Sequence, residues 1–168
     1  MNNPKIKMYI TDYGTITAEL YPEKAPKTVE NFLSLIENHF FDGLIFHRVI
    51  RGFMIQGGGF YPDFSHKDAP SIHGEFIANG CMFNDLKHTR GTLSMARTSD
   101  PDSASSQFFI MHEDGEFLDG QYAAFGKVLE GMDVKDVIMN MMNTSITHLV
   151  QNAFSGVQHL DMTSCQEL

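Results

Sequence analysis

Arg48 is the residue best suited to chemistry in this sequence, because it stands within the mostly apolar run of residues 46–50, which is typical of a β-strand. A guanidinium placed mid-strand is costly unless its donors are satisfied. Gln56 and Gln107 lie in two other apolar runs and are the expected acceptors. Because arginine stays protonated at any working pH, such a group can donate a hydrogen bond to an electron-rich atom of a bound substrate.

The residues around these glutamines sort onto strand faces by the two-residue period of a β-strand. Met54 and Gln56 share one face of residues 53–56, and Gln107 and Phe109 share one face of residues 107–110. Phe108 has the opposite phase and is assigned to the core. The pattern predicts an apolar surface beside the polar groups that hold Arg48.

Many short strands are predicted to position these residues. Alternation in residues 5–11 and 16–20 indicates a β-hairpin with one buried face. Residues 61–90 show little periodicity and are rich in Pro, Gly, His and Asp, which predicts a long excursion over the surface. Further strands are expected at residues 44–50, 53–56, 92–96, 107–111 and 122–128, and a weaker one at 157–165.

Two helices are predicted. Val29, Phe32, Leu33 and Ile36 have the i, i+3, i+4, i+7 spacing of a helix that ends near residue 38. The second is capped by Asp133, and its apolar stripe consists of Val134, Val137, Ile138 and Met141. Many strands with only two helices favour a mainly β fold, a closed antiparallel barrel with helices at its open ends, over a doubly wound α/β fold.

Length and charge narrow the class of protein. The chain has 168 residues and a net charge of −9, and residues 1–168 are expected to form a single domain. Such a surface repels phosphate backbones and anionic lipid, so neither nucleic acid nor a membrane is an expected partner. Residues 1–5 lack the layout of a secretion signal, and Cys81 and Cys165 are too few for a disulfide scaffold. We therefore expect a cytoplasmic protein with reduced thiols.

Six sequence blocks resemble the cyclophilin family and occur in the family's order. They are FHR at 46–48, GFMIQGG at 52–58, GTLSMA at 91–96, SQFFI at 106–110, FLDG at 117–120 and FGKV at 125–128. The resemblance extends from about residue 5 to about residue 138. It implies an eight-stranded antiparallel barrel capped by two α-helices, and peptidyl-prolyl cis-trans isomerase activity on Xaa-Pro bonds in peptides and folding proteins.

The resemblance also implies a role for each matching residue. Arg48 matches the family's catalytic arginine, and Gln56 matches the residue that orients it and contacts the substrate backbone. The pocket that receives the proline ring is matched by Phe53, Met54, Phe109 and Leu118. The rim that binds the peptide chain is matched by Ala96, Arg97, Thr98 and Gln107.

The implied chemistry needs neither a cofactor nor a metal. The barrier to rotation of the prolyl bond, about 18–20 kcal/mol, arises because the nitrogen lone pair is delocalised into the carbonyl. A guanidinium that donates to this nitrogen favours the twisted, pyramidal state over either planar one. Millisecond turnover requires about 10⁴- to 10⁵-fold acceleration, or about 5.5–7 kcal/mol. One charge-assisted hydrogen bond supplies about 1.5–3 kcal/mol, so a dry pocket must supply the rest.

Three substrate-binding positions depart from the family's common residues. Phe117 stands where many members have a tryptophan that contacts the inhibitor cyclosporin, which predicts weaker cyclosporin binding with catalysis retained. Tyr122 replaces a frequent histidine but still offers an apolar body with one polar tip. Arg97 replaces an asparagine common in eukaryotic members, so the peptide preference is expected to shift.

Three alternatives to the isomerase have less support in the sequence. A proline-peptide binding or scaffold module without catalysis would be expected to lack Arg48 or its neighbours, which are present. A hydrolase would need a nucleophile elbow, which the serines at 94, 103, 105 and 106 lack. The histidines that invite a metal hypothesis have no i, i+4 pairing on a helix and no Cys-x-x-Cys beside them, and most are expected in solvent-facing loops. They are His66, His73, His88 and His112.

A barrel without free edges predicts a monomer.

Overall fold

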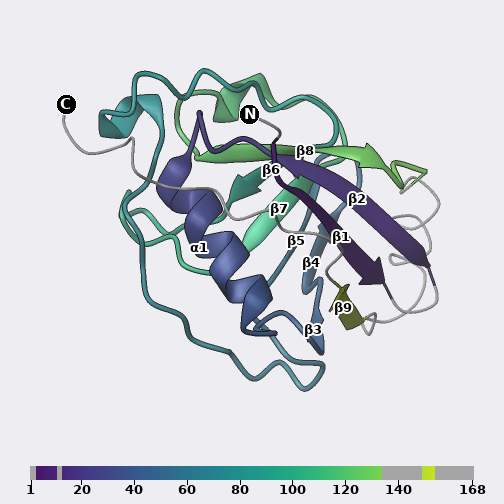
Figure 1. The fold of residues 1–168 in the computed structure, drawn as a ribbon. Helices are drawn as coiled ribbons and strands as arrows, with labels where there is room; N and C mark the ends of the chain where they lie inside the picture. The colour runs from purple at the N-terminus through teal and green to yellow at the C-terminus, as the bar shows by residue number, and fades with distance from the viewer. Residues whose placement is uncertain (1–2, 11–12, 134–148, 154–168) are drawn as a thin grey trace.

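The regular structure of the described chain consists mainly of one antiparallel sheet and one α-helix (Figure 1). The computed structural model describes residues 3–10, 13–133 and 149–153. The strands are β1 (Lys5–Ile10), β2 (Gly14–Leu20), β3 (Leu44–Ile45), β4 (Arg48–Ile50), β5 (Met54–Gly57), β6 (Thr92–Met95), β7 (Phe108–Met111), β8 (Ala124–Glu130) and β9 (Leu149–Ala153). The helix is α1 (Pro26–Glu37), and two short 3-10 turns are η1 (Ile77–Asn79) and η2 (Glu116–Leu118).

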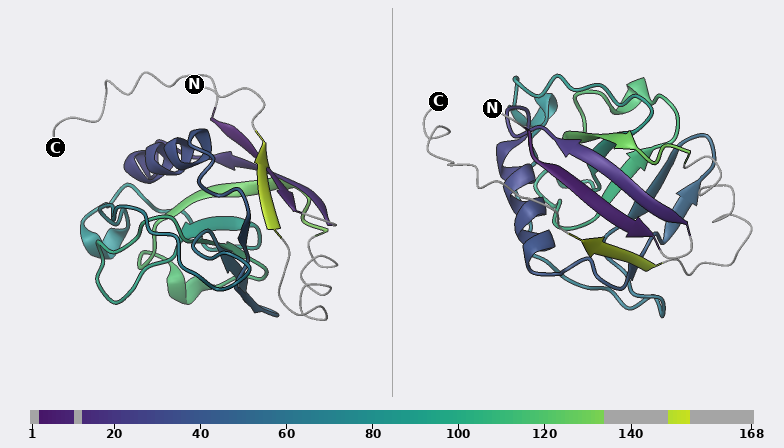
Figure 2. Two further views of the ribbon diagram at one scale, coloured as in Figure 1. Left: turned by 90° about the horizontal axis from the view of Figure 1, so that it is seen from below. Right: turned by 45° about the vertical axis from the view of Figure 1, so that its right-hand side comes forward.

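The sheet is strongly curled. Its nine strands follow the order β3-β9-β1-β2-β8-β6-β7-β5-β4, and neighbouring strands pair antiparallel. β3 and β4 stand at opposite ends of this order, although only residues 46 and 47 separate them in the chain. The sheet therefore curls to accommodate two end strands that lie close in the chain, and the views in Figure 2 show this curl, with β9 beside β1.

The predicted N-terminal hairpin is confirmed. β1 and β2 pair in register from Lys5 opposite Glu19 to Ile10 opposite Gly14. Alternate residues of β1 are buried and exposed in turn, as the sequence alternation predicted. The buried set of β1 consists of Ile6, Met8 and Ile10, which enter the main core.

Helix α1 packs its apolar stripe against the inside of the curled sheet (Figures 1 and 2). Phe32 is buried and its ring lies 5.2 Å from that of Phe108 in an edge-on arrangement. The residue before the helix offers no side-chain cap. Instead, the buried carboxylate of Glu75 accepts hydrogen bonds from the amides of Lys27 (3.0 Å) and Thr28 (2.8 Å). A negative group at this end also complements the helix dipole, so a distant loop residue fixes the start of the helix.

Two separate apolar clusters lie on the two sides of β7. The main core includes Phe108 and Ile110. The smaller cluster consists of Met54, Phe109, Met111 and Leu118. The division follows the two-residue strand period, and it confirms the prediction that Phe108 belongs to the core and has the opposite phase to Phe109.

Several sequence predictions need correction or lie outside the described residues. The strand predicted over residues 44–50 is interrupted, so Arg48 begins β4 and is exposed instead of standing mid-strand. The stripe of the second predicted helix, residues 134–141, and the weak strand at 157–165 fall outside the described chain. β9 was not predicted, because residues 139–156 follow no recognisable helix or strand pattern. Among the described residues, no helix has the length and apolarity to cross a membrane.

Candidate functional site

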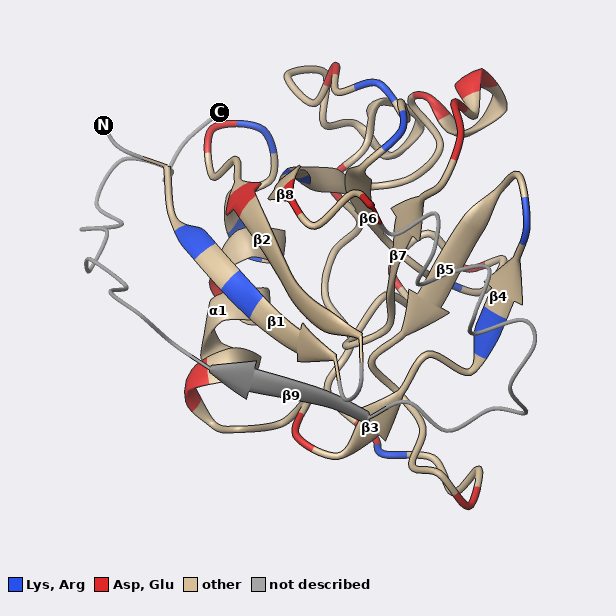
Figure 3. Cartoon of the chain, turned by 90° about the vertical axis from the view of Figure 1, so that its right-hand side faces the viewer, with Lys and Arg blue, Asp and Glu red and all other residues tan. Residues whose placement is uncertain are grey.

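Arg48 is held across the β4–β5 hairpin. Arg48 and Gln56 are directly paired in the strand register, and Nη1 of Arg48 donates to Oε1 of Gln56 at 3.3 Å. Figure 3 shows β4, with its one basic residue in blue, beside β5 at one side of the sheet. The expectation that burial forces Arg48 to find acceptors was wrong, because the side chain is exposed. The predicted partner is nevertheless present, and one acceptor leaves the remaining guanidinium donors available to a ligand.

A second amide continues this contact. Nε2 of Gln56 donates to Oε1 of Gln107 at 3.0 Å. Gln107 lies immediately against Gly59, where an added Cβ would stand 2.6 Å from Gln107 Cγ. The missing side chain at residue 59 therefore makes room for Gln107 to reach Gln56. In the sequence this glycine is the last of a Gly57-Gly58-Gly59 run.

An apolar surface adjoins the arginine. Gln56 pairs with Phe109 across β5 and β7, which places the smaller apolar cluster next to the Arg48 contact. Met54, Phe109 and Leu118 are buried in that cluster. The partly buried residues that pack against it include Phe53, Ala96 and Tyr122. The structure thus brings together the residues that the sequence predicted for a proline pocket.

Aromatic rings border this surface. Tyr122 meets Phe109 edge-on, with ring centroids 6.0 Å apart. Phe117, in η2, is 71% exposed, and its ring lies 5.5 Å from that of Phe53. The contact with Phe53 places the exposed Phe117 ring at the edge of the apolar surface.

Arg97 forms a fixed part of the rim. Its guanidinium lies between the rings of Tyr122 (4.6 Å to the centroid) and Phe76 (5.0 Å). It donates to the carbonyl oxygens of Thr98 and Gln121 at 2.8 and 2.9 Å. Arg97 therefore positions the loop at Thr98 by contacts that a shorter, uncharged asparagine could not make.

The rim is also tied to the amide pair. The backbone amide of Ala96 donates to the carbonyl of Gln107 at 3.0 Å. Thr98 is exposed, and its amide donates to Oγ of Ser103 at 2.9 Å. All twelve residues predicted for the site lie in or beside this one face of the sheet, and the prediction of their individual roles remains to be tested.

His88 is a residue of this site that the sequence reading missed. It is buried, not in a solvent-facing loop, and its ring stacks on Phe109 with centroids 6.1 Å apart. Its Nε2 is 2.9 Å from Oγ of Ser94, and its Nδ1 is 3.1 Å from Oδ1 of Asp119. Burial lowers the pKa of His88, although the hydrogen bond and charge of Asp119 oppose that shift. A neutral imidazole therefore backs the apolar surface.

Ser94, His88 and Asp119 have the connectivity of a nucleophilic triad. Ser94 and His88 are, however, almost completely buried, so no substrate carbonyl can reach the serine. The three residues support the ring of Phe109 from below. Their geometry does not indicate a hydrolase. The position of Ser94 and Asp119 inside two of the six family blocks was the sequence signal that could have indicated this buried contact. His112 is likewise buried, and its Nδ1 accepts from the amide of Gly52 at 3.1 Å.

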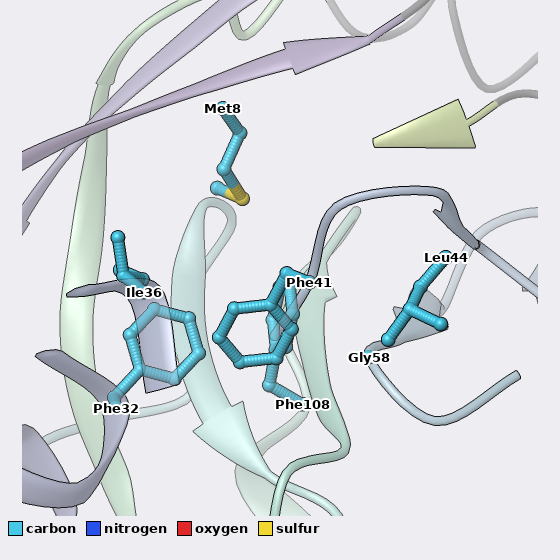
Figure 4. Close-up of a pocket in the computed structure, with 7 residues that line it drawn as sticks. All are labelled: Met8, Phe32, Ile36, Phe41, Leu44, Gly58 and Phe108. Atoms are coloured by element: carbon cyan, nitrogen blue, oxygen red, sulfur yellow. The ribbon is translucent and has the colours of Figure 1, made fainter. Parts of the chain in front are cut away.

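A small void in the main core does not belong to this site. Its lining is apolar and includes the rings drawn in Figure 4, and it lies on the opposite side of β7 from Phe109. It is lined by Met8, Phe32, Ile36, Phe41, Leu44, Gly58 and Phe108. With no polar group to orient a ligand, it is a packing gap. Within the described chain, no cluster of three or more His, Cys, Asp or Glu side chains could hold a metal ion.

Comparison with known proteins gives one family. The family model described as cyclophilin type peptidyl-prolyl cis-trans isomerase/CLD matches residues 5–155. A peptidyl-prolyl cis-trans isomerase of Acinetobacter baylyi is 51% identical over 136 residues, which are 78% of this chain and 70% of that protein. Peptidyl-prolyl cis-trans isomerase B of Escherichia coli is 47% identical over 136 residues, which are 76% of this chain and 80% of that protein.

A solved structure agrees with these sequence relatives. It is a cyclophilin type peptidyl-prolyl cis-trans isomerase from Cryptosporidium parvum, crystallised in the presence of the dipeptide Ala-Pro. It superposes with a TM-score of 0.73 at 28% identity, and the match covers 90% of this chain and 100% of that one.

Proposed function

The chain belongs to the cyclophilin-type peptidyl-prolyl cis-trans isomerases, and from that premise we propose that Arg48, oriented by Gln56, is its catalytic group. The observation that carries this proposal is the position of the Arg48–Gln56 contact, one strand pairing away from Phe109. A bound proline ring on the apolar surface would present its nitrogen to the guanidinium. Donation to that nitrogen localises the lone pair and lowers the barrier to rotation.

The proline ring is proposed to contact Phe53, Met54, Phe109 and Leu118. Their apolar side chains exclude water, and an electrostatic contact is stronger in a site from which water is excluded. The Ala-Pro dipeptide present with the Cryptosporidium parvum relative supports a proline-containing ligand for this surface. Phe117 and Tyr122 are proposed to border the ring.

The chain on either side of the proline is proposed to lie along the rim. Ala96 and Thr98 offer backbone and hydroxyl groups there, and Gln107 adds a side-chain amide. The guanidinium of Arg97 already contacts aromatic rings and carbonyl oxygens. Arg97 is therefore proposed to affect peptide binding through the shape of the rim as well as through its charge. Proline-containing peptides and folding proteins are the proposed substrates.

We also propose that the sheet closes into the predicted eight-stranded barrel. If β3 and β4 are counted as one interrupted strand, the nine-strand order becomes a ring of eight. The two-residue separation of β3 and β4 supports this count. A ring has no free edge strands, which agrees with the predicted monomer.

Further predictions about partners and location remain open to test. Weak cyclosporin binding is proposed because Phe117 provides less contact area than a tryptophan and no indole N–H. The net charge of −9 supports the prediction that neither nucleic acid nor anionic membranes are partners. The cytoplasmic location expected from the N-terminal sequence also stays a prediction.

One NMR titration with an Ala-Pro-containing peptide tests the site. Exchange between the cis and trans resonances of the peptide reports catalysis, and shifts of the protein amides report where it binds. We expect accelerated exchange, with the largest amide shifts around Phe109, Ala96 and Leu118. Largest shifts around the void at Phe32 would contradict the assigned site. Binding without faster exchange would favour the scaffold module.

A further inference from the structure

We infer that His66 is a positioning residue for Arg48, and that it holds the guanidinium in place only while its imidazole is neutral. The inference rests on the proposed role of Arg48 and extends it, because it adds a group in the surface loop that sets the pH range of the reaction. It comes from one continuous line of hydrogen bonds that starts at Arg48 and ends at Asp68.

The line consists of four contacts. Arg48 Nη1 donates to Gln56 Oε1 at 3.3 Å, and Gln56 Nε2 donates to Gln107 Oε1 at 3.0 Å. Gln107 Nε2 is 3.4 Å from Nε2 of His66. On the far side of the ring, Nδ1 of His66 is 2.6 Å from Oδ1 of Asp68. Each side chain in the line therefore uses one atom toward Arg48 and another toward Asp68.

The two ends fix the direction of every bond. Arginine has only donors, and an ionised aspartate has only acceptors. Gln56 must therefore present its oxygen to Arg48 and its NH₂ to Gln107, and Gln107 must present its NH₂ to His66. His66 can accept at Nε2 and donate at Nδ1 only as the neutral tautomer with the proton on Nδ1. The line of hydrogen bonds is complete only with this tautomer.

Protonation of His66 would reverse the last contact. Imidazolium carries N–H on both nitrogens, so two donors, Nε2–H of His66 and the NH₂ of Gln107, would face each other. The conflict is relieved if Gln107 turns its oxygen to His66. Its NH₂ then faces Gln56, which must turn in the same way and present its own NH₂ to Arg48. The acceptor that orients the guanidinium is lost.

Backbone and ring contacts place His66 beside Gln107, although 42% of its side chain is exposed. Phe60 and His66 form an antiparallel β-bridge, and their rings meet edge-on at 4.9 Å. The amide of Lys67 donates to the carbonyl of Gly59 at 2.8 Å. Gly59 is also the residue that makes room for Gln107, so the loop and the amide pair share one fixed segment.

Charged and titratable groups beside His66 bear on this pH dependence. Asp68 contacts it directly, Arg48 faces it through the amides, and His47 lies on the far side of the Phe60 ring. Lys67 points away and donates to the carbonyl of Phe40. Burial, the charge of Arg48 and the proximity of His66 lower the pKa of His47. His47 therefore stays neutral further into acid than an ordinary imidazole.

The test compares three variants by protease-free NMR exchange of an Ala-Pro-containing peptide from pH 5 to 8. In the unmodified protein, kcat/KM should fall on acidification by about two- to tenfold, the range expected for one net hydrogen bond. His66→Gln supplies an acceptor that cannot titrate, so its activity should stay near the pH 8 value throughout. His66→Lys, a permanent donor, should show the low value at every pH.

His73→Gln is the matched control, because His73 is another loop histidine paired with an aspartate, Asp102, at 2.8 Å. It should keep the acid loss of the unmodified protein. The same acid loss in His66→Gln would overturn the inference while leaving the proposed function intact. If the unmodified protein accelerated no exchange at pH 8, the proposed function itself would fail.

A second measurement is independent of catalysis. The ¹⁵N shifts of the His66 ring at pH 8 report which nitrogen carries the proton. The line of hydrogen bonds requires the proton on Nδ1. A ring protonated on Nε2 would contradict the inference whatever the kinetic result.

Discussion

Phe108 and Phe109 are neighbours in β7, yet their side chains pack into different apolar clusters on opposite faces of the sheet. Both are almost fully buried, at 2% and 5% exposure. Phe108 meets Phe32 of α1, whereas Phe109 meets Tyr122 and stacks on His88. One residue supports the fold, and the other is proposed to support the bound proline.

This pair predicts two different outcomes for the same substitution. Phe108→Leu should lower the free energy of unfolding by about 1–2 kcal/mol because it leaves a gap in the main core. Its kcat/KM per folded molecule should be unchanged. Phe109→Leu should lower kcat/KM by about tenfold, since a poorly filled pocket costs about 1–3 kcal/mol in discrimination. Urea unfolding and peptide exchange measure the two effects, and equal losses of activity in both variants would argue against the pocket.

The position of Phe117 makes a prediction about inhibition. Phe117→Trp should tighten cyclosporin binding by about tenfold or more, because the indole adds apolar area and an N–H donor at an exposed position. Isomerase activity should stay within about twofold, since the ring borders the pocket from its open side. Inhibition curves for both proteins provide the measurement. Unchanged inhibition would mean that Phe117 does not limit cyclosporin binding.

Burial of His88 predicts a loss of stability in acid. Burial lowers the pKa of His88 in the folded protein, against the opposing effect of Asp119, whereas in the unfolded chain it lies near about 6.5. Between these two values the unfolded chain binds a proton that the folded protein does not. Stability should therefore be fully present above about pH 6.5 and fall below it, by up to about 1.4 kcal/mol per pH unit.

Urea unfolding at pH 7.5 and 5.5 measures this effect. His88→Gln should be less stable at pH 7.5 but should lose less on acidification than the unmodified protein, while His73→Gln keeps the full loss. If His88→Gln does not fold, an NMR titration of the unmodified protein replaces it. A His88 ring that is protonated at pH 6.5 in the folded state would refute the prediction.

Periodic elements could be predicted from the sequence because each buries one face. The alternation of β1 and the stripe of Phe32 and Ile36 in α1 follow directly from the strand and helix periods. The same period separated Phe108 from Phe109. The six blocks contain nine of the twelve predicted site residues, and Arg97, Thr98 and Tyr122 lie next to them in the sequence. The fold collects all twelve although they lie up to 74 residues apart.

The rest depended on contacts that no local pattern encodes. Glu75 caps α1 from a distant loop, and His88 is buried by contacts with Ser94 and Asp119 from other segments. Loop residues such as His66 carry no periodicity, so their partners become visible only in three dimensions. β9 was not predicted for a related reason: its residues form a strand by pairing with β1 and β3, which lie far away in the sequence.

The most direct test of the account is the cis-trans exchange rate of an Xaa-Pro peptide with Arg48→Ala and with Arg51→Ala at equal folded concentration. Arg51 is an exposed arginine of the same hairpin, in the turn between β4 and β5, so it controls for loss of charge. We expect Arg48→Ala to lower kcat/KM by about 10²- to 10³-fold, as for removal of a transition-state donor, and Arg51→Ala to stay within about twofold. Retention of most activity in Arg48→Ala would contradict the proposed role of the arginine.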